Sequence, residues 1–144
     1  MSTAQPQFVR AMPVLDCADM AVSLAFYRNK LGFHADTWGE PPTFAILQRG
    51  AVTLALAQVD KPAVNKTWAA YLYVTDVDAV YAELMAHGVA IAEPPEDRFY
   101  NCREFTVDDP DGNLLAVGQI RVPNAYPAGL SDNTGRDGQT EAAS

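Results

Sequence analysis

The sequence has few of the side chains that most often bind metals through nitrogen or sulfur, with two cysteines and two histidines among its 144 residues. Cys17 and Cys102 lie far apart and form no metal-type pair such as CxxC. Buried thiols in a reducing, cytoplasmic compartment are therefore expected. His34 follows the predicted end of one helix and His87 lies in the last turn of another, so we interpret both as surface residues rather than metal ligands.

Basic residues are also scarce, since 10 Lys and Arg stand against 18 Asp and Glu, for a formal net charge of −8. This balance argues against nucleic acid as a partner, because phosphates require basic surface. An acidic surface favours cationic ligands, although excess acid also serves solubility alone. No apolar run approaches the roughly 18 residues of a membrane span, and the first ten residues do not resemble a signal peptide. We expect a cytoplasmic protein with no membrane partner.

What the sequence does contain is one structural plan that occurs twice. The balance of 49% hydrophobic and 19% charged residues is that of a globular domain. Each copy has a strand, an Asp that begins a helix, a Gly that ends it, and then three short strands. The first copy has strands at 8–17, 33–38, 43–49 and 51–58 around a helix between Asp19 and Gly32. The second has strands at 68–74, 89–93, 103–107 and 113–119 around a helix between Asp76 and Gly88.

This repeat predicts an α+β fold of two paired βαβββ modules, about 8–58 and 68–119, within a single domain over 1–122. Each module is too small to bury its faces alone. The most economical arrangement is an open, cup-shaped mixed sheet with the helices outside and a ligand in the concave face. Residues 123–144 are rich in Pro, Gly, Ser, Asn and Asp and are predicted to form a polar C-terminal tail.

Three segments in order resemble the vicinal oxygen chelate superfamily, also called the glyoxalase/bleomycin-resistance/dioxygenase fold. VLDCADMAVSLAFYRNKLGF resembles its N-terminal signature, VTDVDAVYAELMAHG its counterpart in the second module, and DDPDGNLL its C-terminal hairpin. The resemblance covers residues 8 to about 119. It implies the same fold of two βαβββ modules around a cup.

Within the superfamily, the chain most resembles the bleomycin-binding resistance proteins. AMPVLDCADM with Pro13 in the first strand, REFTVDDPDGN, and Asn65 before an aromatic-rich strand all resemble that branch. The resemblance implies an acidic homodimer, without catalysis or cofactor, that sequesters a cationic drug in grooves at the subunit interface. Pro13 is compatible with exchange of the first strand between subunits. The chain departs from the branch at Thr37 and around Asn101, where aromatic residues are usual, so bleomycin itself is not implied as the ligand.

The metal-dependent enzymes of the superfamily hold a divalent cation with His, Gln or Glu from four strands. In this chain the matching positions hold Met12, Ala69 and Ala116, with only the terminal Gln58 and Gln119 able to coordinate. The sequence therefore predicts no family metal site. The alternative is a metal-dependent lyase, isomerase or dioxygenase with a non-standard site, and an accessory protein without a small ligand is a third possibility.

The remaining chemistry is aromatic and acidic. Alternation along 68–74 predicts Tyr71 and Tyr73 on the cup face with Ala69, and Trp68 on the opposite face. Glu104 is a candidate general base if buried, although pairing with Arg103 or another cation is the commoner outcome. Cys102 beside Arg103 is interpreted as a structural thiol. The predicted ligand-binding residues are Asp36, Trp38, Phe44, Tyr71, Tyr73, Tyr100, Arg103 and Glu104.

Overall fold

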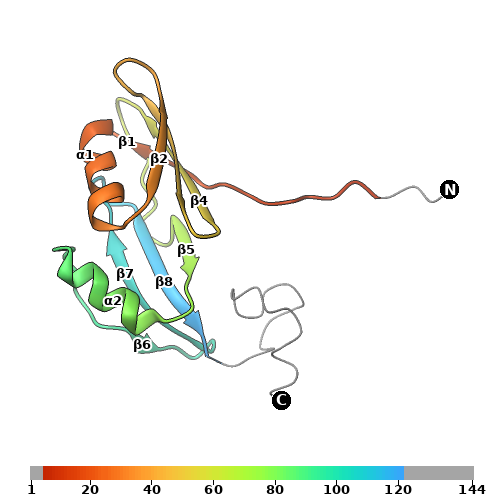
Figure 1. Cartoon of the computed structure of the whole chain (residues 1–144). Coiled ribbons are helices and arrows are strands. Elements are labelled where there is room, and N and C mark those ends of the chain that lie inside the picture. Colours follow the sequence, from red (N-terminus) through yellow and green to blue (C-terminus); the bar gives the residue numbers. More distant parts are fainter. Residues whose placement is uncertain (1–4, 122–144) are drawn as a thin grey trace.

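The computed structural model describes residues 5–121, which form two four-stranded sheets with one helical segment packed on each (Figure 1). The first sheet has the strand order β1-β4-β3-β2 and the second has the order β5-β8-β7-β6. In each sheet the first strand of its module pairs in parallel with the last, and the other pairings are antiparallel. The predicted α+β fold of two βαβββ modules is confirmed.

The elements of the first module are β1 (Val14–Cys17), α1 (Met20–Ala25), the π-helical η1 (Phe26–Lys30), β2 (His34–Trp38), β3 (Phe44–Arg49) and β4 (Val52–Gln58). Asp19 caps α1, because its carboxylate accepts hydrogen bonds from the backbone N–H groups of Ala21 and Val22. Gly32 follows η1 with a φ of 75°, a backbone conformation that glycine adopts without strain. The helix between Asp19 and Gly32 therefore begins and ends where the sequence predicts.

The second module contains β5 (Ala70–Tyr73), α2 (Val77–Ala86), β6 (Glu96–Asp97), β7 (Cys102–Asp108) and β8 (Leu114–Ile120). Asp76 caps α2 through a hydrogen bond from the N–H of Ala79, and Gly88 follows the helix with a φ of 83°. Within residues 5–121, no helix is long and apolar enough to cross a membrane.

Two strand predictions are wrong. No strand forms at 89–93, where Val89 and Ile91 instead pack against the core, and the short strand β6 lies at Glu96–Asp97. The strand predicted over 8–17 is paired only from Val14, and residues 5–13 (called the arm below) are exposed along their whole length. The backbone contact with β4 ends at Pro13, whose carbonyl accepts from the N–H of Ala55.

Both helices lie on the same side of the two sheets, and the arm leaves on the other side (Figure 1). A single hydrophobic core fills the space between helices and sheets. It takes Met20, Leu24 and Tyr27 from the first helical segment, and Val77 and Leu84 from α2. Each sheet has helix cover on one face only, so among residues 5–121 no helix or strand is packed on the opposite face, which is called the bare face below (Figure 1). The helices lie outside, as predicted.

The two modules are joined by polar contacts as well as by the core. The hydroxyl of the fully buried Tyr27 donates to the Asp109 carboxylate over 2.8 Å, across the boundary between the modules. Arg49 forms a two-pronged ion pair with Glu83 at 2.8 and 2.9 Å. The polar tail predicted over 123–144 lies outside the described residues.

Candidate functional site

The bare face of the second sheet carries a group of aromatic side chains that we call the aromatic patch. Its members are Trp68, Tyr71, Tyr73, Phe99 and Tyr100. Ring centroids lie 4.7 Å apart for Tyr71 and Tyr73, 4.9 Å for Trp68 and Tyr71, and 6.2 Å for Trp68 and Tyr100. These distances are typical of mutually packed aromatic rings. Trp68 remains 42% exposed and Phe99 94% exposed, so the patch presents ring surface to solvent.

Glu104 is the buried residue that holds the rings of this patch in place. On β7, Phe105 and Val107 belong to the core, so the alternating residues Cys102, Glu104 and Thr106 face the other way. The Glu104 residue is only 3% exposed. One of its carboxylate oxygens accepts from the Tyr71 hydroxyl at 2.9 Å, and the other accepts from the Tyr100 hydroxyl at 2.7 Å. A buried carboxylate with two charge-assisted hydrogen bonds fixes both rings in place.

The cation nearest to Glu104 is Arg98, not Arg103. The Arg98 Nε lies 3.5 Å from Glu104 Oε2, and its Nη1 lies 2.8 Å from Glu96 Oε1. Arg103 lies on the opposite face of β7, where its guanidinium contacts Asp78 of α2 at 3.0 Å and Asp97 at 3.5 Å. The structure therefore does not bring Arg103 together with the other candidate residues of the second module.

The environment keeps the patch hydroxyls protonated. Burial, followed by the hydrogen bond to Glu104, raises the pKa of Tyr100 to about 12. Burial first, then hydrogen bonds with Cys102 and Glu104, also raises the pKa of Tyr71. The pKa of Tyr73 is raised for the same principal reason. Tyr71 and Tyr100 therefore keep the protons that they donate to Glu104.

The remaining candidates lie on the bare face of the first sheet. Ala35 and Leu47 face the core, so their neighbours Asp36 and Trp38 on β2, and Phe44 on β3, face the other way. The rings of Trp38 and Phe44 pack at 6.0 Å, and Trp38 is 52% exposed. The exposed Asp36 carboxylate lies 3.2 Å from the His34 ring, measured between Oδ1 and Nε2. Among residues 5–121, the ring contacts of these candidates form two separate sets, one on each sheet.

The prediction that Trp68 lies on the opposite face from Tyr71 is wrong, and Trp68 is not among the predicted ligand-binding residues. Its ring packs with Tyr71 and Tyr100 on the bare face, because Trp68 precedes β5 and does not follow the alternation of that strand. The side chain of Asn65 sets this geometry, since its Oδ1 accepts from the N–H groups of Thr67 and Trp68 at 2.8 and 3.3 Å. The sequence signal for such a turn is the Asn itself, because its side chain readily bonds the backbone two residues further on.

At the centre of the bare face of the second sheet, the residue is an alanine, Ala116. Ala116 on β8 lies in register with Tyr71 on β5 and Thr106 on β7, and it is fully buried. Within the part of the chain that the structure describes, no three His, Cys, Asp or Glu side chains gather closely enough to hold a metal ion. Both histidines are exposed and both cysteine side chains are buried, as predicted.

Comparison with known proteins identifies the family to which most of the chain is similar. A family model described as "Glyoxalase/Bleomycin resistance protein/Dioxygenase superfamily" matches residues 11–117. A protein of Mycolicibacterium smegmatis is 36% identical over 111 residues, which cover 76% of this chain and 93% of the relative.

Among solved structures, the bleomycin-binding protein from bleomycin-producing Streptomyces verticillus, complexed with copper(II)-bleomycin, is similar with a TM-score of 0.63 and 28% identity. The match covers 78% of this chain and 97% of that protein. A lactoylglutathione lyase from Agrobacterium tumefaciens has a TM-score of 0.63 and 20% identity over 79% of this chain and 95% of the lyase, which shows a shared fold alone. Similar structures thus include both a drug-binding protein and an enzyme.

Proposed function

The chain belongs to the Glyoxalase/Bleomycin resistance protein/Dioxygenase superfamily, and we propose that it is a metal-independent binding protein that sequesters a cationic or aromatic small molecule. The aromatic patch carries this proposal. Tyr71 and Tyr73 offer ring surface for stacking, and Trp68 supplies the ring type that attracts cations most strongly. The similarity to a bleomycin-binding protein supports a ligand of this class.

A metal-independent role is supported by the residues at the positions where metal-dependent relatives would supply ligands. Ala69 and Ala116 have no donor atom, and Glu104 already accepts hydrogen bonds on both carboxylate oxygens. A catalytic divalent cation of the zinc type requires about three nitrogen, oxygen or sulfur ligands that converge on one point. The acidic net charge of −8 favours a cationic ligand over an anionic one.

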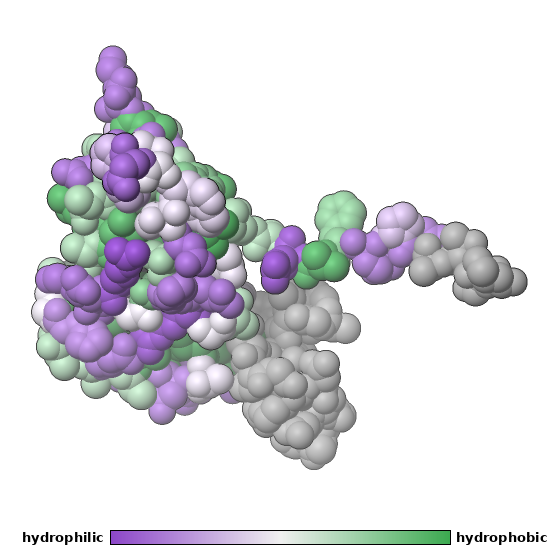
Figure 2. Space-filling view, turned by 45° about the horizontal axis from the view of Figure 1, so that its top comes forward, coloured by the Kyte–Doolittle hydropathy of each residue, from purple (hydrophilic) through white to green (hydrophobic). Residues whose placement is uncertain are grey.

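We propose further that the functional unit is a homodimer in which the two bare faces complete each other. The candidate residues of one chain form two separate sets, and each set is open to solvent on its outer side. A second copy packed on the bare faces would oppose the first sheet of one chain to the second sheet of its partner and so create two grooves. The arm supports this arrangement, because it projects clear of the body with Phe8 and Val9 exposed (Figure 2).

The test is a binding titration by tryptophan fluorescence with two cationic aromatic probes, metal-free bleomycin and acriflavine. We expect saturable binding of at least one probe in the presence of a chelator. Trp68→Ala and Tyr73→Ala are expected to weaken it about tenfold each, since an aromatic contact is worth about 0.5–1.5 kcal/mol beyond its buried area. Because Trp68→Ala removes a fluorophore, that variant is measured by the fluorescence of acriflavine.

Met85→Ala is the matched control, because this 47%-exposed apolar residue lies on α2, on the other side of the sheets. It should leave the affinity unchanged. Light scattering after size exclusion should give the mass of two chains. A strict monomer would contradict the dimer, and stoichiometric Ni, Zn, Mn or Fe in protein purified without a chelator would favour the enzymatic alternative.

A further inference from the structure

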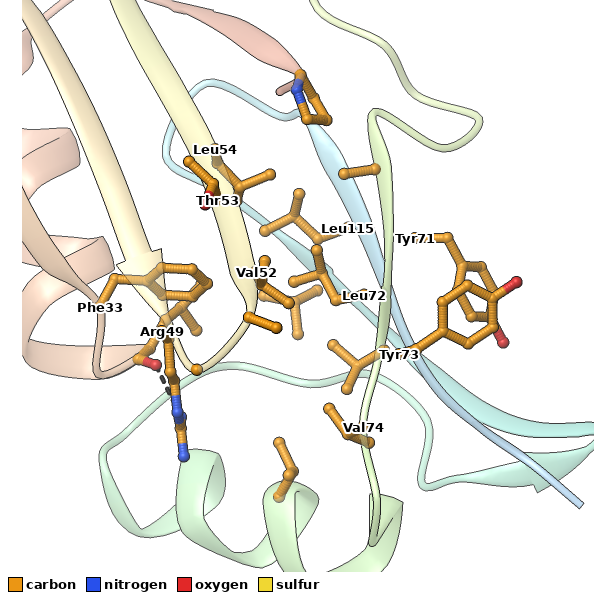
Figure 3. Close-up of a pocket in the computed structure, with 18 of the residues that line it drawn as sticks. Phe33, Arg49, Val52, Thr53, Leu54, Tyr71, Leu72, Tyr73, Val74 and Leu115 are labelled. Carbon is orange, nitrogen blue, oxygen red and sulfur yellow. Dashed lines mark hydrogen bonds between the residues drawn. The ribbon is translucent and has the colours of Figure 1, made fainter. Parts of the chain in front are cut away.

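A second concave feature lies on the helix side of the sheets, at the boundary between the two modules (Figure 3). It is a partly open cavity of about 590 Å³. Its walls come from the end of η1 and the start of β2, the β3–β4 hairpin, β5, α2 and the core faces of β7 and β8. The side chains that define it most clearly are Phe33, Val52, Leu54, Leu72, Val80 and Leu115.

Most side chains that line this cavity are apolar, and the polar lining residues are Arg49, Thr53, Thr75, Tyr71 and Tyr73. Within the described part of the chain, Arg49 is the one charged residue that lines it, and its guanidinium donates to the Glu83 carboxylate at 2.8 and 2.9 Å and to the Leu31 carbonyl at 2.9 Å. Among residues 5–121, no buried side-chain polar atom lacks a hydrogen-bond partner. The side chains around the cavity therefore leave no buried polar atom unpaired, and the apolar walls favour an apolar guest over ordered water.

The cavity is separate from the aromatic patch, although β5 forms a wall of both. Leu72 points into the cavity, whereas the rings of Tyr71 and Tyr73 point away from it on the other side of the strand (Figure 3). The period of two along a strand produces this division. Tyr71 and Tyr73 also line the cavity, but their rings extend from the opposite side of β5, so a molecule bound among Val52, Leu72 and Leu115 lies across the strand from the patch (Figure 3).

We propose that this cavity is a second ligand site, which takes a neutral, hydrocarbon-rich molecule of one to three rings. The volume falls in the range of about 300–1,000 Å³ that drug-sized ligands occupy in proteins. The ion-paired Arg49 has no free charge to attract an anion, and a cation would find no carboxylate other than Glu83, which Arg49 holds. Burial of apolar ligand surface against these walls provides the affinity.

The arm of the same chain does not fill this space. Ala11 and Pro13 lie at its edge, but both are exposed and the chain runs outward from there (Figure 1). The proposal is independent of the function assigned to the aromatic patch, because it rests on different side chains.

The test uses the full-length protein and the neutral fluorescent probe N-phenyl-1-naphthylamine. We expect a saturable rise in fluorescence with one probe bound per chain. The cavity-filling substitution Val80→Phe should weaken probe binding at least tenfold, while acriflavine binding to the patch is retained. Val52→Phe, which fills the cavity from the β3–β4 hairpin, provides a second variant in case Val80→Phe does not fold.

Trp68→Ala is the reciprocal control and should leave the affinity for N-phenyl-1-naphthylamine unchanged. Loss of probe binding in Trp68→Ala with no effect of Val80→Phe would place the probe in the aromatic patch and overturn the proposal. Absence of any binding would also overturn it. A third contrary result is binding that appears only after residues 1–11 are deleted, since it would show that the arm of a second copy occupies the cavity.

Discussion

At the scale of single residues, the chemistry of the candidate site depends on one buried carboxylate and the small residues beside it. Glu104 holds Tyr71 and Tyr100 by hydrogen bonds of 2.9 and 2.7 Å. Tyr71 lies directly over Gly118 of β8, where there is no side chain to displace it. The position of the rings thus follows from a glycine on one strand and a glutamate on the next.

Gly118→Ala is expected to displace Tyr71, because a Cβ at this position would overlap the tyrosine hydroxyl and ring. We expect a loss of about 1–3 kcal/mol in the free energy of unfolding, as for other overpacked sites, together with weaker binding of acriflavine. The measurement is urea denaturation of a double-mutant cycle with Tyr71→Ala. If Gly118→Ala costs as much in the Tyr71→Ala background as in the parent, the contact between the two residues is not its cause.

The tyrosines of the patch also predict a pH dependence of stability. The pKa of Tyr100 in the folded protein is raised to about 12, above its ordinary value of about 10. Between these values the unfolded chain loses this proton while the folded protein keeps it. Stability is therefore full below about pH 10 and falls as the pH rises toward 12.

Tyr100→Phe is expected to reduce the slope of that fall, as measured by urea denaturation at several pH values from 8 to 11. Met85→Ala, on α2, removes no titratable group and is the control, so it should leave the slope unchanged. An identical slope in Tyr100→Phe and the parent would show that Tyr100 does not contribute to the alkaline loss of stability.

At the scale of elements, two of the contacts that join the modules differ in burial, and burial decides which of the two contributes more to stability. Tyr27 and Asp109 are both buried, and the carboxylate of Asp109 also accepts from the N–H groups of Asp111 and Asn113. Arg49 and Glu83 have side chains 38% and 34% exposed. Removal of one partner of a buried hydrogen bond costs about 1–3 kcal/mol, whereas an exposed ion pair contributes about 0–1 kcal/mol.

Tyr27→Phe is accordingly expected to lower the free energy of unfolding by about 1–3 kcal/mol, since it leaves the buried Asp109 carboxylate without one donor. Glu83→Gln should lower it by less than about 1 kcal/mol, and by still less in 1 M NaCl because salt screens exposed charges. Both are measured by urea denaturation of the full-length protein. A larger effect of Glu83→Gln than of Tyr27→Phe would contradict the ranking by burial.

At the scale of the whole molecule, net charge and the open faces act together. The chain carries a formal charge of −8, and the bare faces expose Trp38 and Trp68 on different sheets. A charge of one sign over the surface steers oppositely charged ligands and opposes ligands of the same sign. Aromatic contact area then determines how long a ligand remains bound.

The affinity for a cationic probe should therefore depend on salt. Acriflavine is expected to bind severalfold more weakly in 500 mM than in 50 mM NaCl, because screening shortens the range of the electrostatic attraction. N-phenyl-1-naphthylamine, which is neutral, should bind equally well at both concentrations. Fluorescence titrations measure both, and an equal loss for the two probes would show that long-range charge does not contribute.

Much of this architecture can be predicted from the sequence because the signals are local. Asp19 and Asp76 cap their helices, and Gly32 and Gly88 end them at positive φ, so both helices are found where the sequence indicates. The two strand predictions that failed also rested on local signals. The 89–93 segment has the composition of a strand but meets no partner strand, and Pro13 ends the pairing of the first strand.

The sequence by itself determined the two-module repeat, the helix ends, the acidic charge and the lack of metal-ligating residues at Met12, Ala69 and Ala116. Tertiary structure alone decided that Glu104 meets Tyr71 and Tyr100, that Arg103 pairs with Asp78, and that a cavity remains between the modules. The physical reason is sequence distance. Caps and alternation act over two to four residues, whereas Tyr71 and Glu104 are 33 residues apart and meet only because strand register brings them together.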